Sequence, residues 1–98
     1  MANSKKTDGI KYLRIFLLPS PHRPANKQLI KLLTEIRAEK RMVQTELAAR
    51  LGKPASYVAK VELGDRRIDV IEFIEYCQAL GISPRTAFVR FLRKIEGI

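Results

Sequence analysis

Hydrophobic residues recur along most of the chain at the spacing of an amphipathic α-helix, and polar residues fill the positions between them. Short stretches that hold most of the glycine and proline residues separate these periodic segments. The pattern predicts helices over residues 26–40, 44–51, 54–63, 70–80 and 84–95. The predicted fold class is therefore all-α, a bundle of five helices with short connections.

Residues at the ends of the periodic segments are those that begin and end helices. Asn26 is a competent N-cap for the first helix, and Asp69 with Glu72 has the spacing of a capping box at the start of the fourth. Gly52 follows the second segment, where a left-handed residue ends a helix. Pro54 is predicted at the first position of the third helix, because its missing N–H needs no partner there.

One face of each predicted helix is apolar, and these faces should form the core. The expected core positions are Leu29, Ile30, Leu33, Ile36, Leu47, Ala48, Leu51, Val58, Val61, Ile71, Phe73, Ile74, Cys77, Leu80, Ala87, Phe88, Phe91, Leu92 and Ile95. A chain of 98 residues can bury one such core but not two. We therefore expect a single domain over residues 26–98 and an N-terminal arm over residues 1–25.

The arm contains an apolar run, residues 10–18, interrupted only by Lys11 and Arg14. So short a run does not distinguish a strand from a helix, although its Tyr, Ile and Phe content leans toward a strand. The prolines at positions 19, 21 and 24 then predict an extended linker. Because an exposed run of this hydrophobicity favours association, we expect the arm to pack on its own domain or on a second copy.

The chain is strongly basic, with 19 Lys and Arg residues against 10 Asp and Glu and a formal net charge of +9. This excess predicts a polyanionic partner, either nucleic acid or an anionic membrane surface; a generally solvated basic surface is the alternative. No secretory signal is evident, and residues 10–18 are too few to span a bilayer. We therefore expect a cytoplasmic protein without a membrane partner.

Residue types for catalysis or metal binding are sparse. Cys77 is the only cysteine and His22 the only histidine, so neither an internal disulfide nor a zinc site built from Cys and His can form. No Gly-rich phosphate loop, paired-carboxylate pocket or nucleophile with its base is recognisable. We expect no enzyme activity, no catalytic residue and neither a metal nor another cofactor.

The stretch QTELAARLGKPASYVAKVELG, residues 44–64, is the most informative part of the chain. Two short amphipathic segments flank Gly52, and in the second Val58 and Val61 face inward while small and polar side chains face outward. This arrangement, over residues 44–63, is typical of a helix-turn-helix. The outer face of the second helix is the surface that such a motif inserts into the DNA major groove.

With these residues the chain resembles the Cro/lambda-repressor-like, Xre-type helix-turn-helix regulators. The resemblance is carried by QTELA (44–48), LG (51–52), SYV (56–58) and ELG (62–64), and by the run 66–73 ending in ALG (79–81), which is similar to small bacterial and prophage members. It extends from about residue 29 to residue 84. It implies a lambda-repressor-like domain that binds double-stranded DNA as a transcriptional repressor, with helix 54–63 in the major groove, as a homodimer on an inverted repeat.

The resemblance also implies which residues read the bases: Ala55, Ser56, Ala59 and Lys60. Close relatives often have glutamine at the first of these positions and serine at the third, whereas alanine offers only a methyl group. Direct readout would then depend on Ser56 and Lys60, with Lys53 as a third candidate. The Lys60 ammonium can donate to guanine or, equally, bind a phosphate.

The phosphate contacts implied in the same way are Gln44, Lys53, Tyr57, Arg66 and Arg67. Each has an alternative. Gln44 can hydrogen-bond within its own helical turn, and Tyr57 can pack over the end of the third helix. The two arginines can pair with Asp65 and Asp69 in a solvated turn instead of releasing counterions from DNA.

Family members commonly pair an arginine late in the first helix with a glutamate at the end of the third, and Arg37 and Glu62 occupy these positions. The resemblance implies a partly buried ion pair that orients the reading helix. Two positions depart from the family pattern. Arg41 replaces a glycine that ends the first helix, and Val43 replaces a threonine that caps the second, which should fray unless a neighbouring side chain compensates.

Two other functions remain open. The same fold serves antitoxins, so the chain can be the DNA-binding partner of another protein, a toxin or another regulator, with the apolar arm as the binding segment. Alternatively, it is a protein–protein adaptor that kept the fold and lost DNA reading, which would account for Ala55 and Ala59.

Overall fold

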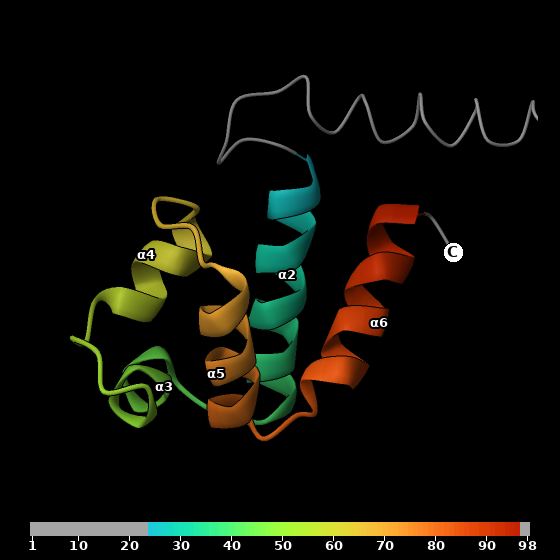
Figure 1. The fold of residues 1–98 in the computed structure, drawn as a ribbon. Coiled ribbons are helices and arrows are strands. Elements are labelled where there is room, and N and C mark those ends of the chain that lie inside the picture. Colours follow the sequence, from blue (N-terminus) through green and yellow to red (C-terminus); the bar gives the residue numbers. More distant parts are fainter. Residues whose placement is uncertain (1–23, 97–98) are drawn as a thin grey trace, which may run out of the picture.

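The computed structural model describes residues 24–96, which form five helices and no strand. The helices are α2 (Pro24–Glu39), α3 (Gln44–Arg50), α4 (Tyr57–Leu63), α5 (Val70–Leu80) and α6 (Pro84–Glu96). Helix α2 runs through the middle of the bundle, with α3 and α4 on one side and α6 on the other (Figure 1). Helix α2 packs against α4 and α6, and α5 packs against α3 and α6. The predicted all-α fold class is confirmed.

Helix α2 begins earlier than predicted. Asn26 lies inside the helix rather than at its N-cap, and Pro24 is the first described residue of α2. Proline fits a first-turn position because its φ is already helical and its missing N–H has no intrahelical acceptor to lose. Residues 24 and 25, which the sequence analysis assigned to the arm, therefore belong to α2, and the predictions for residues 1–23 lie outside the described residues.

Helix α4 begins at Tyr57, so the predicted start at Pro54 is wrong. The Tyr57 N–H donates to the Pro54 carbonyl at 2.9 Å, a bond that closes a tighter turn than an α-helix makes. The first bond with α-helical spacing joins the Lys60 N–H to the Ser56 carbonyl at 3.0 Å. Ala55 and Ser56 consequently lie on the turn that leads into α4 rather than on the helix itself.

The core lies between the five helices. Its members are Leu32, Leu33, Ile36, Met42, Leu47, Ala48, Tyr57, Val58, Val61, Phe73, Tyr76, Cys77, Leu80 and Ala87. The sequence pattern missed Leu32 and Tyr76, which are completely buried. Because α2 is covered by α4 and by α6, its buried face is wider than one helical stripe, and both Leu32 and Leu33 lie inside it.

Three predicted core residues are exposed, and those predictions are wrong. Ile71 of α5 is 60% exposed, Ile74 is 36% exposed and Phe88 of α6 is 48% exposed. Helix α5 has the sequence VIEFIEYCQAL, with apolar residues on more than one face. The spacing of apolar residues does not show which of these faces is buried. In the structure, α5 packs against α3 and α6, and its buried face is the one that carries Tyr76 and Cys77.

Two of the predicted helix ends are observed, the capping box before α5 and the glycine after α3. The Asp69 side chain accepts from the Glu72 N–H and the Glu72 side chain accepts from the Asp69 N–H, so the capping box is confirmed. Gly52 has a φ of 66°, as a glycine that ends α3 requires. Arg41 adopts the same left-handed conformation after α2, with a φ of 54°, and is the only described residue other than glycine to do so.

Candidate nucleic-acid interface

Helices α3 and α4 form a corner on the side of the molecule away from α6 (Figure 1). Leu47 and Ala48 of α3 and Val58 and Val61 of α4 are buried, and the two helices pack directly against each other. This burial fixes which side of each short helix faces solvent. The turn between them and the outer side of α4 together make the surface that residues 44–63 were predicted to present.

The predicted base readers lie on this outer surface. Ala55, Ser56 and Lys60 are exposed, and Ala59 is half-buried. Because Ala55 and Ser56 precede the first residue of α4, they lie near the N-terminal end of this helix, while Ala59 and Lys60 lie one turn further along. Ala55 and Ala59 have small side chains, so the backbone is close to the surface at these two positions.

A charged network connects this corner to α2. Arg37 Nε donates to Glu62 Oε2 at 2.7 Å, and Arg37 Nη2 donates to Glu62 Oε1 at 3.0 Å. The third guanidinium nitrogen, Nη1, donates to the Met42 carbonyl at 2.8 Å. The side chains of the pair are only 18% and 9% exposed, and the hydrogen bond to Glu62 raises the pKa of Arg37. This bidentate pair holds the end of α4 on α2.

Gln44 joins the same network. Its Nε2 donates to Glu62 Oε1 at 2.8 Å. An amide nitrogen carries two hydrogens, so one N–H of Gln44 points to Glu62 and the second is not used by this bond. Of the two interpretations of Gln44, the bond within its own turn is not the one observed. The Glu62 carboxylate instead orients the Gln44 amide from a neighbouring helix.

Tyr57 is the centre of a second cluster. Its side chain is almost completely buried, and burial raises the pKa of its hydroxyl group. Lys53 Nζ lies 5.4 Å from the centre of its ring, and the guanidinium carbon of Arg66 lies 5.3 Å from it. Both cations are within the range of a cation–π interaction. Tyr57 therefore packs into the domain, and its ring holds two exposed cations at the surface.

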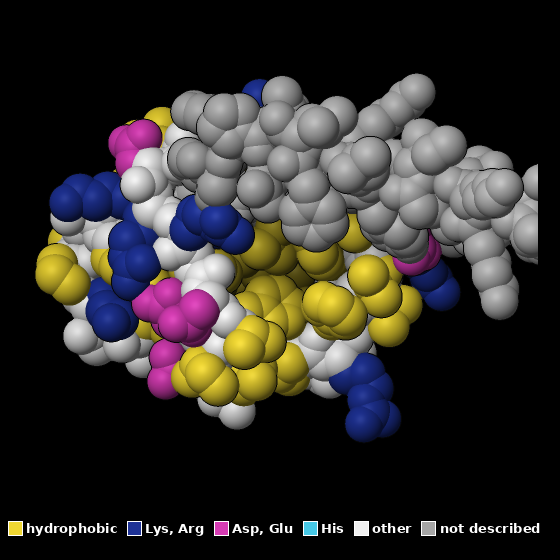
Figure 2. Space-filling model, turned by 45° about the horizontal axis from the view of Figure 1, so that its top comes forward, with side chains coloured by type: hydrophobic (Ala, Val, Ile, Leu, Met, Phe, Trp, Pro, Cys, Tyr) yellow, Lys and Arg dark blue, Asp and Glu magenta, His cyan; other side chains and the backbone are white. Residues whose placement is uncertain are grey.

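Arg66, in the loop after α4, pairs with a residue that the sequence analysis did not name as its partner. Arg66 Nη2 donates to Glu72 Oε2 at 2.6 Å and its Nη1 to the Arg67 carbonyl at 2.7 Å. Asp69 caps α5. Both arginines are exposed, and Figure 2 shows basic side chains gathered on the side where α4 lies. The Arg66–Glu72 pair was missed because it joins a loop to a helix with no recurrent spacing.

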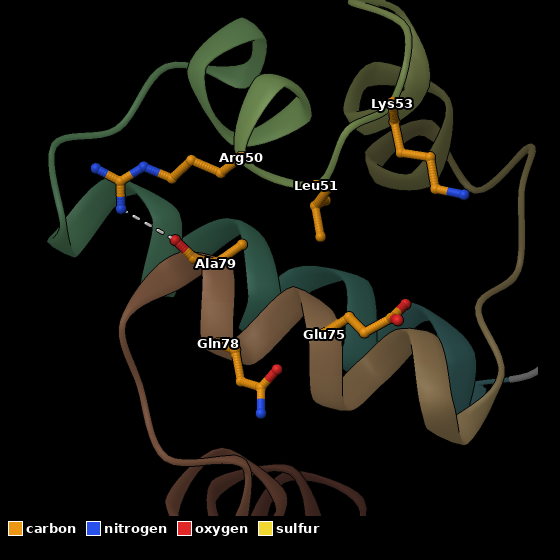
Figure 3. A pocket seen from close by; sticks show the side chains of 6 residues that line it. All are labelled: Arg50, Leu51, Lys53, Glu75, Gln78 and Ala79. Carbon is orange, nitrogen blue, oxygen red and sulfur yellow. Dashed lines mark hydrogen bonds between the residues drawn. The ribbon is translucent and has the colours of Figure 1, made fainter.

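A shallow polar hollow of about 490 Å³ lies next to the corner, between α3 and α5. Figure 3 shows Arg50 reaching across it from α3, and its Nη1 donates to the Ala79 carbonyl of α5 at 3.2 Å. Arg50 also pairs with Glu46 of its own helix at 3.0 Å. Leu51, Lys53, Glu75 and Gln78 complete the lining. The long side chains here tie α3 to α5.

Within residues 24–96, no group of three or more His, Cys, Asp and Glu residues is arranged to hold a metal ion. None of the helices in this range combines the length and the hydropathy needed to cross a membrane.

Comparisons with known proteins place this geometry in context. The helix-turn-helix family HTH_3 matches residues 33–86. An XRE-family-like protein from Pseudomonas syringae pv. tomato is 40% identical, with 74% of this chain and 91% of that chain covered and a TM-score of 0.69. The restriction–modification controller protein C.AhdI from Aeromonas hydrophila is 33% identical over 61% of this chain and 91% of that one, with a TM-score of 0.56.

A third solved structure shows the same fold at lower sequence similarity. It is the controller protein C.Esp1396I, solved as a tetramer in complex with its natural 35-base-pair operator. Its identity to this chain is 22%, its TM-score is 0.65, and 70% of this chain and 91% of that chain are covered. The search of curated proteins returned no match.

Proposed function

The chain belongs to the helix-turn-helix family HTH_3, and on that premise we propose that it is a sequence-specific DNA-binding transcriptional regulator, a repressor that binds as a homodimer to an inverted repeat. The observation that carries the proposal is the exposed α3–α4 corner. Its outer side is small and polar, exposed cations flank it, and the Arg37–Glu62 pair sets its angle. Such a regulator acts in the bacterial cytoplasm and needs neither catalysis nor a cofactor.

Base readout is assigned to the turn before α4 and to the first turns of α4. Ser56 and Lys60 are exposed and carry the donors, and a lysine at this place can donate to guanine O6 and N7. Ala55 and Ala59 supply methyl groups for contact with thymine and let the protein backbone approach the base edges. Few donors per subunit mean that one copy reads little sequence.

Phosphate binding is assigned to Gln44, Lys53, Tyr57, Arg66 and Arg67. The Glu62 carboxylate orients the Gln44 amide, and the ring of Tyr57 holds Lys53 and Arg66 at the surface, so these groups are placed before DNA arrives. Pre-placed donors lose less side-chain entropy on binding. Tyr57 itself contributes mainly through the two cations that it positions.

A homodimer supplies the specificity that one copy lacks. Two helix-turn-helix units of this kind read half-sites roughly 34 Å apart. The exposed apolar side chains of α5 and α6, among them Ile71, Ile74 and Val89, provide a surface for a second copy. The structure of the C.Esp1396I tetramer on its operator supports assembly on DNA for a protein of this fold.

The test is selection of bound DNA from a random pool with the full chain, followed by affinity measurements at several salt concentrations. We expect a palindromic site whose half-sites are about one helical turn apart. Lys60→Ala should relax the preference at one position per half-site, by about 1–3 kcal/mol. Arg85→Ala is the matched control, because Arg85 is an exposed cation on α6, away from the corner.

The salt dependence tests the phosphate contacts separately. Lys53, Arg66 and Arg67 make six basic contacts with phosphates per dimer. A plot of the logarithm of the DNA association constant against the logarithm of the salt concentration should therefore have a slope of about −5. Lys53→Ala should reduce that slope by about 2 without changing the selected sequence. Recovery of no preferred sequence, or equal effects of Lys60→Ala and Arg85→Ala, would contradict the proposal.

A second candidate function has its own support. The apolar surface that includes Ile71 and Ile74 also suits a different protein, which would make the chain the DNA-binding partner of a toxin or another regulator. In that case the purified chain stays monomeric, and Ile71→Asp leaves its DNA affinity unchanged. Under the homodimer proposal, Ile71→Asp weakens both self-association and binding to the palindrome.

A further inference from the structure

An apolar groove lies between α2, α5 and α6, on a different part of the molecule from the α3–α4 corner (Figure 2). Its volume is about 190 Å³, and its walls are Leu29, Ile68, Val70, Phe73, Phe88 and Phe91, with Asp69 at the rim. The Phe88 ring lies 6.3 Å from that of Phe73 and 6.0 Å from that of Phe91, centre to centre, so an aromatic cluster lines one side. The walls of the groove have the apolar composition of a protein core.

Two of the apolar side chains in the groove walls are largely exposed. Val70 is 70% exposed and Phe88 is 48% exposed, and Ile71 and Ile74 extend the apolar surface along α5. A contiguous apolar surface of this kind marks a place where another chain segment packs. Burying a side chain such as Phe88 removes a substantial unfavourable exposure to water.

We propose that the groove is the docking site of this chain's own N-terminal segment, residues 10–18, which binds in cis. The segment, IKYLRIFLL, is the most apolar run outside the described residues, and it has no charged residue after Arg14. Its apolar side chains match the walls of the groove. Its two cations, Lys11 and Arg14, complement the negative charge of Asp69, which lines the groove while it caps α5.

The length of the tether favours docking within one molecule. Pro24 begins α2, and Leu29 in the groove wall is five residues further along that helix, about 7.5 Å away. Residues 19–23 alone span up to about 17 Å when extended, and the prolines among them favour an extended chain. The segment therefore reaches the groove without strain. A tether this short also gives it a high effective concentration there, in the millimolar range.

The volume of the groove indicates which side chain of the segment it can hold. A dry cavity of about 150 Å³ lined by Leu, Ile and Phe accommodates a benzene molecule. The groove is slightly larger and has similar walls, so it accommodates one aromatic ring. The segment offers Tyr12 and Phe16. Phe16 fits the groove better, because a tyrosine hydroxyl would meet few hydrogen-bond partners among these walls.

Docking in cis is independent of DNA binding, and it leaves Ile71, Ile74 and Val89 outside the groove for the dimer contact. The two proposals therefore fail separately. Loss of arm docking would leave the operator selection unchanged, and absence of DNA binding would leave the cross-linking result below unchanged.

Cross-linking of cysteine pairs in the full chain tests the proposal. A variant with Leu17→Cys and Val70→Cys is treated with a short bis-maleimide, and products are resolved by denaturing electrophoresis. Cys77 is buried and its raised pKa, about 11, keeps its thiol protonated, so it should not react. The Leu17→Cys variant with Ala55→Cys is the matched control, because Ala55 is also exposed but lies on the α3–α4 corner.

We expect an intramolecular product for the Leu17–Val70 pair, with a yield that does not change on dilution, and little for the Leu17–Ala55 pair. Adding Phe16→Asp should lower the docking equilibrium at least about tenfold, since it removes the buried ring. A product that forms only between molecules and increases with concentration would overturn docking in cis and assign the groove to a second copy. No product with either pair would overturn the proposal altogether.

Thermal unfolding provides a second measurement. Phe16→Asp should lower the melting temperature of the full chain and increase its binding of a hydrophobic dye, whereas Ser4→Asp should change neither. Because Phe16 is not one of the described core residues, this substitution leaves the described core intact. An unchanged melting temperature and dye signal in Phe16→Asp would contradict docking.

Discussion

Substitution of Arg37 by methionine should destabilise the domain far more than loss of an exposed ion pair. The change removes two hydrogen bonds to Glu62 and one to the Met42 carbonyl, at distances of 2.7–3.0 Å. It leaves the Glu62 carboxylate, only 9% exposed, with the Gln44 amide as its remaining observed partner. Breaking a buried pair costs about 3–5 kcal/mol, and the partial exposure of Arg37 reduces this to about 2–4 kcal/mol.

A loss of this size should be large in a thermal scan. For a domain of this length each kcal/mol shifts the melting temperature by about 4–8 °C, so a decrease of about 8–32 °C is expected, measured by circular dichroism together with urea unfolding. Because the pair positions α4, the affinity for the selected DNA site should also fall at temperatures where the variant remains folded.

The chain offers a closely matched control in Arg90. It forms a bidentate pair with Glu39, at 2.8 and 3.2 Å, that joins α6 to α2, but the side chains are 34% and 53% exposed. Arg90→Met should cost only about 0.2–1 kcal/mol. If Arg37→Met and Arg90→Met lowered the free energy of unfolding equally, burial would not be what makes the Arg37–Glu62 pair more stabilising than the Arg90–Glu39 pair. An Arg37→Met/Glu62→Gln double variant should recover part of the loss, because no buried charge then remains unpaired.

Three further outcomes are expected. Arg41→Gly should raise the free energy of unfolding by about 0.5–1 kcal/mol, because it removes a left-handed non-glycine residue, and Arg41→Ala, which keeps that conformation, should not. Val43→Thr should add about 0.5–2 kcal/mol, because Val43 has the backbone conformation of an N-cap but makes no capping bond; a variant no more stable than Val43→Ala would contradict this. Burial raises the pKa of Cys77 from 9.0 to about 11, so its contribution to stability is complete below pH 9 and is lost as the pH rises toward 11. Urea unfolding at pH 8 and pH 10.5 should show this decrease, and Cys77→Ala should show less of it.

Much of the local structure followed from signals within a few residues. The capping box of Asp69 and Glu72 and the helix-ending Gly52 are both observed where the sequence placed them. The error at Pro54 is instructive, because proline is compatible with a first helical turn but also with the tighter turn that the Tyr57–Pro54 hydrogen bond closes. Local signals indicated that a helix starts nearby and did not specify at which residue.

The candidate interface was only partly accessible from the sequence. The family resemblance pointed to Arg37 and Glu62, which are 25 positions apart and make contact in the structure. The residues themselves carried no signal that Gln44 would bind the same carboxylate or that Arg66 would bind Glu72. Each of these contacts depends on the angle between two packed helices or on the path of a loop.

The sequence alone determined the number of helices in residues 24–96, most of their ends and the helix-turn-helix, because helix period, caps and glycine conformations act over a few neighbouring residues. Only the tertiary structure decided which apolar face of α5 and α6 is buried. Tyr76 lies in the core while Ile71 and Phe88 face outward, because burial depends on which helices pack against each face. The exposed apolar surface and the groove of α2, α5 and α6 follow from that choice.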